Sequence, residues 1–131
     1  MPELRHILYV EDDPDIQEVV RMALEAIGGY QVTLASSGAT ALAIAEDVAP
    51  DLILLDVMMP DLDGPSTLAL LRALPSMATV PVVFITAKVQ SSEVEHFKSL
   101  GAVDVIAKPF DPMLLPDRVH TIWKTHQPVA L

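Results

Sequence analysis

The sequence predicts an α/β fold: a doubly wound parallel sheet of five strands with helices on both faces, built in the order (βα)5. Short apolar segments alternate along the chain with segments whose apolar residues recur at helical spacing. Residues 52–55 are apolar without alternation, which is typical of a strand covered on both faces. Because consecutive parallel strands are joined by right-handed crossovers, this order requires a helical layer on each side of the sheet.

The composition indicates one folded domain and restricts its partners. A chain of 131 residues, 51% of them hydrophobic, buries roughly two-thirds of its unfolded surface. The 18 acidic and 8 basic residues give a net charge of −10, which argues against nucleic acid or an anionic membrane as a direct partner. There is no cysteine for a disulfide or thiolate metal site, and no apolar run approaches the ~18–20 residues of a membrane span. We expect a soluble, cytoplasmic protein.

The first strand is predicted over residues 7–10 and is followed by a helix with a clear start. Asp13 is suited to be its N-cap, and Pro14 its first residue, where the missing N–H costs nothing. The pair Gly28-Gly29 ends the helical pattern. The apolar positions of this helix are Ile16, Val19, Val20, Ala23, Leu24 and Ile27.

The next strand, residues 30–35, is short and alternating, which favours a place toward the sheet edge. Ser36 or Ser37 is expected to cap the second helix, and Pro50 to end it. The strand over residues 52–55 follows and runs directly into Asp56.

The second half of the chain repeats this alternation. It is predicted to form a helix over residues 65–74, a strand over 81–86, a helix capped by Ser91 or Ser92 and closed by Gly101, a strand over 103–107, and a final helix with Leu115, Val119, Ile122 and Trp123 inward. Pro116 removes a backbone donor near the start of the final helix, so we expect that start to be loosened or delayed.

This topology brings reactive side chains to one edge of the sheet. The residues at the carboxyl ends of the first, third, fourth and fifth strands are Glu11 and Asp12, Asp56, Thr86, and Lys108. Two carboxylates about 5 Å apart repel by about 3 kcal/mol at an effective dielectric of about 20. A divalent cation relieves that repulsion, and carboxylates with a carbonyl and water are the ligands that Mg²⁺ prefers. A lysine and a hydroxyl beside them suit a phosphoryl group, so the edge is predicted to be a phosphoryl-transfer site.

These residues resemble the response-regulator receiver domain of two-component signalling, and the resemblance covers essentially the whole chain. The motifs that carry it are Ile7-Leu8-Tyr9-Val10-Glu11-Asp12, Asp56-Val57-Met58-Met59-Pro60 with Asp63-Gly64, Thr86-Ala87, and Lys108-Pro109-Phe110. It implies a flavodoxin-like fold with strand order 2-1-3-4-5, a receiver domain over residues 1–125 and a tail over 126–131; we expect no output domain.

The resemblance also implies a role for each site residue. Asp56 would be the phospho-acceptor, Asp12 a direct Mg²⁺ ligand, Glu11 a second acid acting largely through water, the Met58 carbonyl a further ligand, Thr86 the switch hydroxyl, and Lys108 the cation on the phosphoryl group. The peptide bond from Lys108 to Pro109 would be cis. Asp13 falls one place past the metal-binding pair and is expected to serve only as a helix cap.

One position departs from the family. Two residues before Ala107, where many receivers carry an aromatic residue that turns inward on activation, this chain has Val105. We therefore expect the signal to travel through Thr86 and loop movement, without an aromatic rotamer change.

Three functions of different classes are considered. The favoured one is a stand-alone receiver, not an enzyme in the usual sense, that takes a phosphoryl group from a histidine kinase or histidine phosphotransfer protein and signals by contact with a downstream protein. The second is a Mg²⁺-dependent phosphohydrolase with an aspartyl nucleophile, but such enzymes typically need a second acid at the place of Met58. The third is a degenerate receiver used as a scaffold, against which the intact site residues count.

Overall fold

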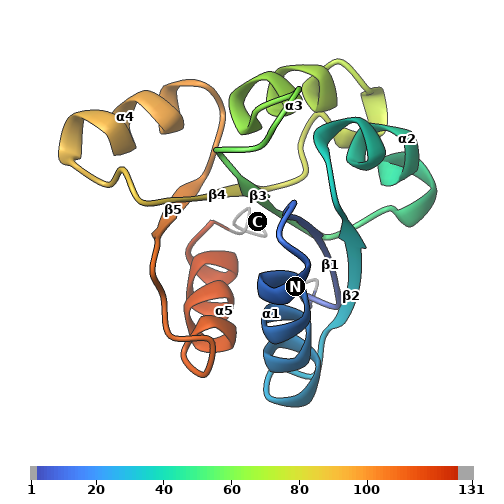
Figure 1. Cartoon of the computed structure of the whole chain (residues 1–131). Helices are drawn as coiled ribbons and strands as arrows, with labels where there is room; N and C mark the ends of the chain where they lie inside the picture. Colours follow the sequence, from blue (N-terminus) through green and yellow to red (C-terminus); the bar gives the residue numbers. More distant parts are fainter. Residues whose placement is uncertain (1–2, 127–131) are drawn as a thin grey trace, which may run out of the picture.

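A parallel sheet of five strands forms the centre of the protein, in the order β2-β1-β3-β4-β5 (Figure 1). The computed structural model describes residues 3–126, so residues 127–131 of the predicted tail lie outside the described part. The strands are β1 His6–Val10, β2 Gln31–Ala35, β3 Leu52–Asp56, β4 Val82–Thr86 and β5 Asp104–Ala107. The predicted fold class and strand order are confirmed, and β2 lies at a sheet edge as its alternation indicated.

Helices cover both faces of the sheet. They are α1 Pro14–Ala26, α2 Gly38–Val48, α3 Gly64–Arg72, α4 Ser91–Ser99 and α5 Leu115–Thr125, with a short 3-10 helix, η1, over Pro75–Met77. Figure 1 shows α1 and α5 side by side on one face and α2, α3 and α4 on the other. Every residue of β3 and β4 is buried, which explains why neither strand alternates in sequence.

The two faces of the sheet form two separate apolar layers. Side chains from α2, α3 and α4 pack on one face against Leu8, Ile53, Leu55, Phe84 and Val105. Side chains from α1 and α5 pack on the other against Ile7, Tyr9, Leu54, Ile85 and Ile106. Because successive residues of a strand point to opposite faces, β1 contributes to both layers and is fixed between β2 and β3.

Two predicted helix starts are confirmed. The Asp13 carboxylate accepts the backbone N–H groups of Asp15 and Ile16, and Pro14 is the first residue of α1. The Ser37 hydroxyl accepts the Thr40 N–H at 3.0 Å, which selects Ser37 over Ser36 as the cap of α2.

The predicted cap of α4 is wrong. The helix begins at Ser91, its N-cap is Gln90, and no side chain caps it. Both candidate serines, Ser91 and Ser92, already lie inside the first turn, where a hydroxyl no longer faces the free N–H groups. The Gln90 carbonyl instead accepts the N–H groups of Glu93 and Val94.

The delayed start of the last helix is confirmed. After Pro112 the chain makes a turn, and α5 begins only at Leu115, with Pro116 in its first turn. A proline is tolerated at that place because N–H groups of the first turn have no partner within the helix. Within residues 3–126, none of the helices combines the length and the apolar character that crossing a membrane would require.

Candidate functional site

The site lies where β1, β3, β4 and β5 end. Asp56 and Thr86 are the last residues of β3 and β4, Glu11 directly follows β1, and Lys108 directly follows β5. The Lys108 N–H donates to the Thr86 carbonyl at 2.9 Å, which continues the pairing of the two strands into the loop. Parallel pairing therefore sets these strand ends beside one another, as the sequence predicted.

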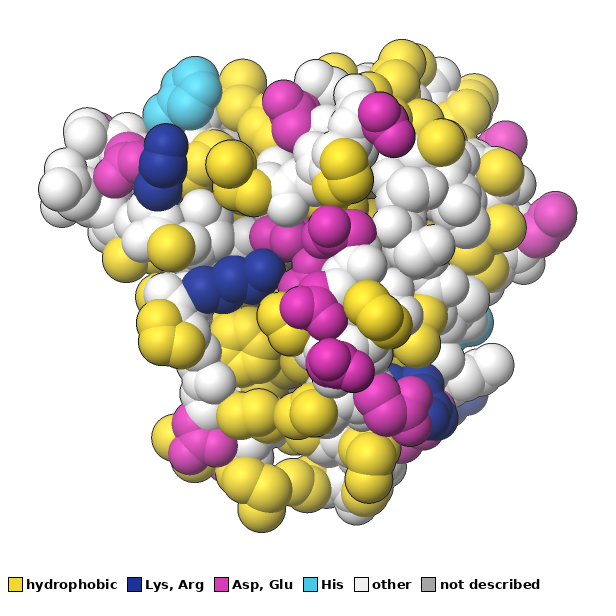
Figure 2. All heavy atoms as spheres, viewed as in Figure 1, with side chains coloured by type: hydrophobic (Ala, Val, Ile, Leu, Met, Phe, Trp, Pro, Cys, Tyr) yellow, Lys and Arg dark blue, Asp and Glu magenta, His cyan; other side chains and the backbone are white. Residues whose placement is uncertain are grey.

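Three carboxylates converge at this edge. Oxygens of Glu11, Asp12 and Asp56 all lie within 4.8 Å of one another. Glu11 is 1% exposed and Asp56 3% exposed, whereas Asp12 is exposed to solvent. Asp13 is not a member of the cluster and serves α1 as its cap. Figure 2 shows the acidic side chains gathered in the middle of this face.

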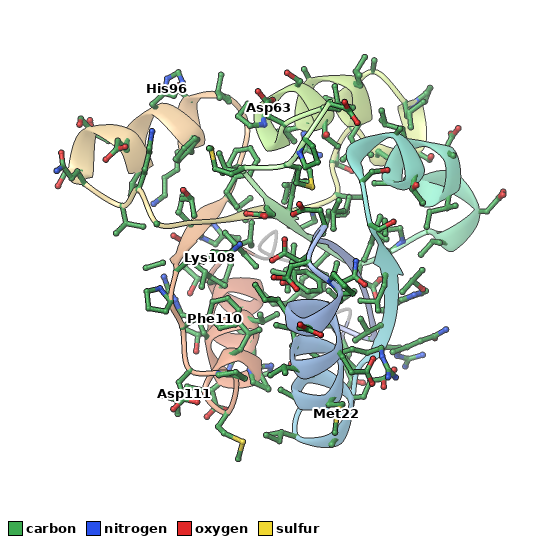
Figure 3. All side chains as sticks on the ribbon, viewed as in Figure 1. Met22, Asp63, His96, Lys108, Phe110 and Asp111 are labelled. Carbon is green, nitrogen blue, oxygen red and sulfur yellow. The ribbon has the colours of Figure 1, made fainter. Side chains whose placement is uncertain are left out.

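A single ammonium group joins the two buried carboxylates. Lys108 Nζ lies 3.1 Å from Asp56 Oδ1 and 3.2 Å from Glu11 Oε1. Figure 3 shows Lys108 on the segment that follows β5, on the side facing the ends of β1 and β3. Burial acts to lower the pKa of Lys108, but its hydrogen bond to Asp56, the charge of Asp56 and the same contributions from Glu11 outweigh burial, so the pKa is raised. The lysine is therefore held in its charged form.

The Glu11 carboxyl group has a raised pKa. Burial, followed by hydrogen bonding to Asp56 and the charge of Asp56, raises the pKa of Glu11 to about 7, although Lys108 opposes the shift. Its Oε2 accepts the Asp12 N–H at 3.1 Å. One lysine thus compensates only part of the negative charge that the fold collects here.

The loop after β3 is held close to the site by backbone contacts. The Val57 N–H donates to the Ile85 carbonyl at 3.1 Å, and the Gly64 N–H donates to the Val57 carbonyl at 2.9 Å. A Cβ at Gly64 would lie 2.6 Å from the Asp56 carbonyl oxygen, so only glycine fits there. The Met58 side chain is 69% exposed, and the role of its carbonyl as a metal ligand stays a prediction.

Two further features complete the site. The Thr86 side chain is buried, and its hydroxyl accepts the Lys88 N–H at 3.1 Å. The Lys108–Pro109 peptide bond is cis, which confirms that expectation.

Sequence reasoning missed Gln17. Its side-chain amide on α1 donates to the Glu11 carbonyl and ties the first helix to the end of β1. The only available signal was its position four residues after the Asp13 cap, one helical turn further along the same side of α1.

A family model described as the response regulator receiver domain matches residues 7–120, which include every site residue named above. The chain belongs to this receiver family.

Curated relatives of this receiver are longer than the chain. The transcriptional regulatory protein CseB of Streptomyces avermitilis is 39% identical over 124 residues, which are 95% of this chain and 51% of CseB. The transcriptional regulatory protein BaeR of Escherichia coli is 37% identical over 122 residues, 93% of this chain and 49% of BaeR. The chain therefore spans about half the length of these relatives.

Solved receivers match over nearly their whole length. The chemotaxis response regulator CheY4 of Vibrio cholerae has a TM-score of 0.84 at 28% identity, covering 92% of this chain and 99% of CheY4. The receiver domain of the sensor histidine kinase PA1611 of Pseudomonas aeruginosa has a TM-score of 0.78 at 34% identity, covering 93% and 97%, and that structure has a magnesium ion coordinated in its active-site cleft.

The raised pKa of Glu11 predicts a pH dependence of stability in the metal-free receiver. Between its ordinary value of 4.5 and about 7, the unfolded chain has released the Glu11 proton while the folded protein still holds it. Since the folded state then binds more protons, the contribution of Glu11 to the free energy of unfolding falls as pH rises through this range. Replacing Glu11→Gln removes the titration. In EDTA, we expect the Tm of this variant relative to wild type to increase from pH 4.5 to 7.

Thermal melts at several pH values check this, with Glu95→Gln, an exposed carboxylate on α4, as the control whose Tm difference stays constant. A Glu11→Gln difference that shrinks or stays level over the same range would contradict the electrostatic description of the site.

Proposed function

We propose that this receiver accepts a phosphoryl group on Asp56 from a phosphohistidine, in a Mg²⁺-dependent reaction. The observation that carries the proposal is the contact of Lys108 Nζ with Asp56 Oδ1 at 3.1 Å beside the cluster of three carboxylates. The membership of the chain in the receiver family supports it. The protein then catalyses only its own phosphorylation and dephosphorylation and turns over no separate substrate.

The donor set fits a magnesium ion. Glu11, Asp12 and Asp56 offer hard oxygen ligands within 4.8 Å of one another, and the exposure of Asp12 leaves room for the waters that Mg²⁺ keeps. We assign Asp12 and Asp56 as direct ligands, Glu11 as a ligand largely through water, and the Met58 carbonyl as a further ligand. When bound, Mg²⁺ would neutralise carboxylate charge and polarise the phosphoryl oxygens.

Three residues of the chain then have separate roles in the transfer. An Asp56 carboxylate oxygen attacks phosphorus, forming the O–P bond while the N–P bond to the donor imidazole breaks. The Lys108 ammonium, already at Asp56, pairs with a phosphoryl oxygen and stabilises the charge of the transition state. The Thr86 hydroxyl, at the neighbouring strand end, donates to another phosphoryl oxygen.

The alternative functions have less support. A phosphohydrolase of the kind considered above would place a second acid at position 58, where an exposed methionine side chain stands. A degenerate scaffold would not need to keep a lysine within 3.2 Å of both buried carboxylates.

Acetyl phosphate tests the chemistry directly. Incubated with this donor and Mg²⁺, the wild-type protein should form an aspartyl phosphate, because the site itself stabilises in-line transfer. Asp56→Asn should abolish labelling, and EDTA should abolish it in the wild type. Mass spectrometry of the intact protein and of its peptides measures both. An equal yield of aspartyl phosphate in Asp56→Asn would refute the assignment of the acceptor.

An apolar groove beside the site suits the phosphohistidine partner. A cavity of about 380 Å³ runs from Lys108 past Phe110 to Ile16 and Val19 of α1. It continues into a second cavity of about 430 Å³ lined by Val19, Met22 and Met113. Figure 2 shows hydrophobic side chains gathered on this part of the face, next to the acidic centre. A protein that brings a phosphohistidine to Asp56 must cover this edge, so we assign the groove to the histidine kinase or histidine phosphotransfer protein.

This assignment predicts that a charge placed in the groove slows phosphorylation by a phosphohistidine protein but does not slow phosphorylation by acetyl phosphate. Met22 is 58% exposed (labelled in Figure 3), so Met22→Glu should fold normally. We expect its phosphorylation by a phosphohistidine protein, found by screening the histidine kinases of the same genome, to slow about tenfold or more. Its phosphorylation by acetyl phosphate should be unchanged.

The matched control is Leu70→Glu, which places the same charge on a 48% exposed residue of α3, on the other face of the sheet. If both variants lost the same amount of transfer, or if Met22→Glu also slowed with acetyl phosphate, the partner would not occupy this groove.

The route of the signal follows from Val105. This side chain is 6% exposed and packs among the residues of the α2, α3 and α4 layer. Branched at Cβ, it is restricted at χ1, so we infer that it stays in place when Asp56 is phosphorylated. Movement then concentrates in the loops after β3 and β4, residues 58–64 and 86–92.

Backbone NMR or amide exchange with beryllofluoride and Mg²⁺ measures this distribution. We expect the largest changes in those two loops and small ones along β5 and α5. The opposite distribution, with residues 103–107 and 115–123 most affected and the loop after Thr86 unchanged, would show that Val105 serves as a neutral replacement for the aromatic residue.

A further inference from the structure

Gln17 holds the two backbone carbonyls that flank Asp12. Its side-chain amide donates to the Glu11 carbonyl, and its backbone N–H donates to the Asp13 carbonyl at 3.0 Å. Gln17 is partly buried and lies at the end of the first turn of α1, which begins at Pro14. A single residue therefore closes the connection between β1 and α1 around Asp12.

The peptide group between Glu11 and Asp12 is held at both ends. Its carbonyl accepts the Gln17 amide, and its N–H donates to Glu11 Oε2 at 3.1 Å. On the preceding side, the Glu11 N–H donates to the Ala35 carbonyl of β2 at 3.0 Å. A rotation of this peptide plane would break both of its own hydrogen bonds, so the direction in which the chain enters Asp12 is fixed.

Asp12 depends on its backbone more than the two other acids of the cluster do. Glu11 and Asp56 are buried and contact Lys108, whereas Asp12 is exposed, so packing does not hold its carboxylate. Ordering a free side chain when a ligand binds costs conformational entropy. Groups that orient a metal ligand in advance reduce this cost, which is why such outer partners contribute to metal affinity.

We propose that Gln17 is a positioning residue for the metal site, whose amide fixes the peptide between Glu11 and Asp12 and so directs the Asp12 carboxylate toward the ion. The inference rests on the proposed function, since it takes Asp12 as a Mg²⁺ ligand. Gln17 acts through the backbone of Glu11 and has no contact with the reacting atoms in this assignment. Its loss should therefore weaken Mg²⁺ binding without changing the transfer step itself.

The variant Gln17→Met removes the donor with little other change, because methionine is uncharged, of similar length and of similar helix propensity. Calorimetry with Mg²⁺, at a temperature where both proteins are folded, should give a Kd roughly 3- to 10-fold higher than that of the wild type, the effect of one hydrogen bond. The matched control is Gln31→Met, at an exposed residue that begins β2 at the opposite end of the sheet. Its Kd should equal that of the wild type.

Two further measurements separate positioning from a general structural role. In EDTA, amide exchange followed by NMR should be faster at Asp12 in Gln17→Met, with the amides of β1 unchanged, because only the peptide after Glu11 has lost a partner. In phosphorylation by acetyl phosphate, the Mg²⁺ concentration that gives half the maximal rate should rise by the same factor as the Kd. The rate at saturating Mg²⁺ should match that of the wild type.

The two proposals fail in different ways. If the wild-type protein does not bind Mg²⁺, the metal site of the proposed function is wrong. If the wild-type protein binds Mg²⁺ and Gln17→Met binds it with the same Kd, the role of Gln17 is wrong and the proposed function stands. A Gln17→Met protein with a lower Tm in EDTA but the wild-type Kd would likewise show that Gln17 only stabilises the fold.

Discussion

The contact of one lysine with two buried carboxylates is the constraint on which this edge of the fold depends. Glu11 and Asp56 are almost completely covered, and a buried charge is tolerated only when it is paired. Lys108 reaches both because β5 ends beside β4 and the Lys108 N–H continues that pairing to Thr86. The sheet order, the strand register and the loop after β5 must all be in place before this pairing can form.

Local signals in the sequence were sufficient to predict much of the fold and the convergence of Glu11, Asp12, Asp56 and Lys108 at one edge of the sheet. The pair Asp13-Pro14 and the residue Ser37 mark helix starts because capping depends on a few adjacent residues. The residues before Asp56 are apolar without alternation, and this local pattern predicted that helices cover both faces of β3. Parallel topology then fixes which strand ends meet, so Glu11, Asp12, Asp56 and Lys108 could be brought together without coordinates.

The sequence did not predict the exact start of α4 or the contacts between side chains of different helices and strands. Ser91 and Ser92 resemble caps, but a shift of the helix start by one or two residues puts both inside α4. Gln17 looks like any polar residue of α1 until the helix is packed against the end of β1, where its amide reaches the Glu11 carbonyl. The sharing of Lys108 between two acids depends in the same way on where the side chains of three strand ends lie in the folded protein.

The resting site is electrostatically unfavourable in a way that suits a switch. Glu11 carries a raised pKa, and the single ammonium group of Lys108 is shared between two buried acids. The burial of Glu11 beside Asp56 costs free energy in the resting state, and the contacts with Lys108 offset only part of that cost. A site fully satisfied at rest would gain nothing from phosphorylation, and a ligand shifts an equilibrium only by its differential interaction with the two states. If Asp56 is the phospho-acceptor, as proposed, the buried acids at the ends of β1 and β3 are where phosphoryl chemistry would be coupled to a change in conformation.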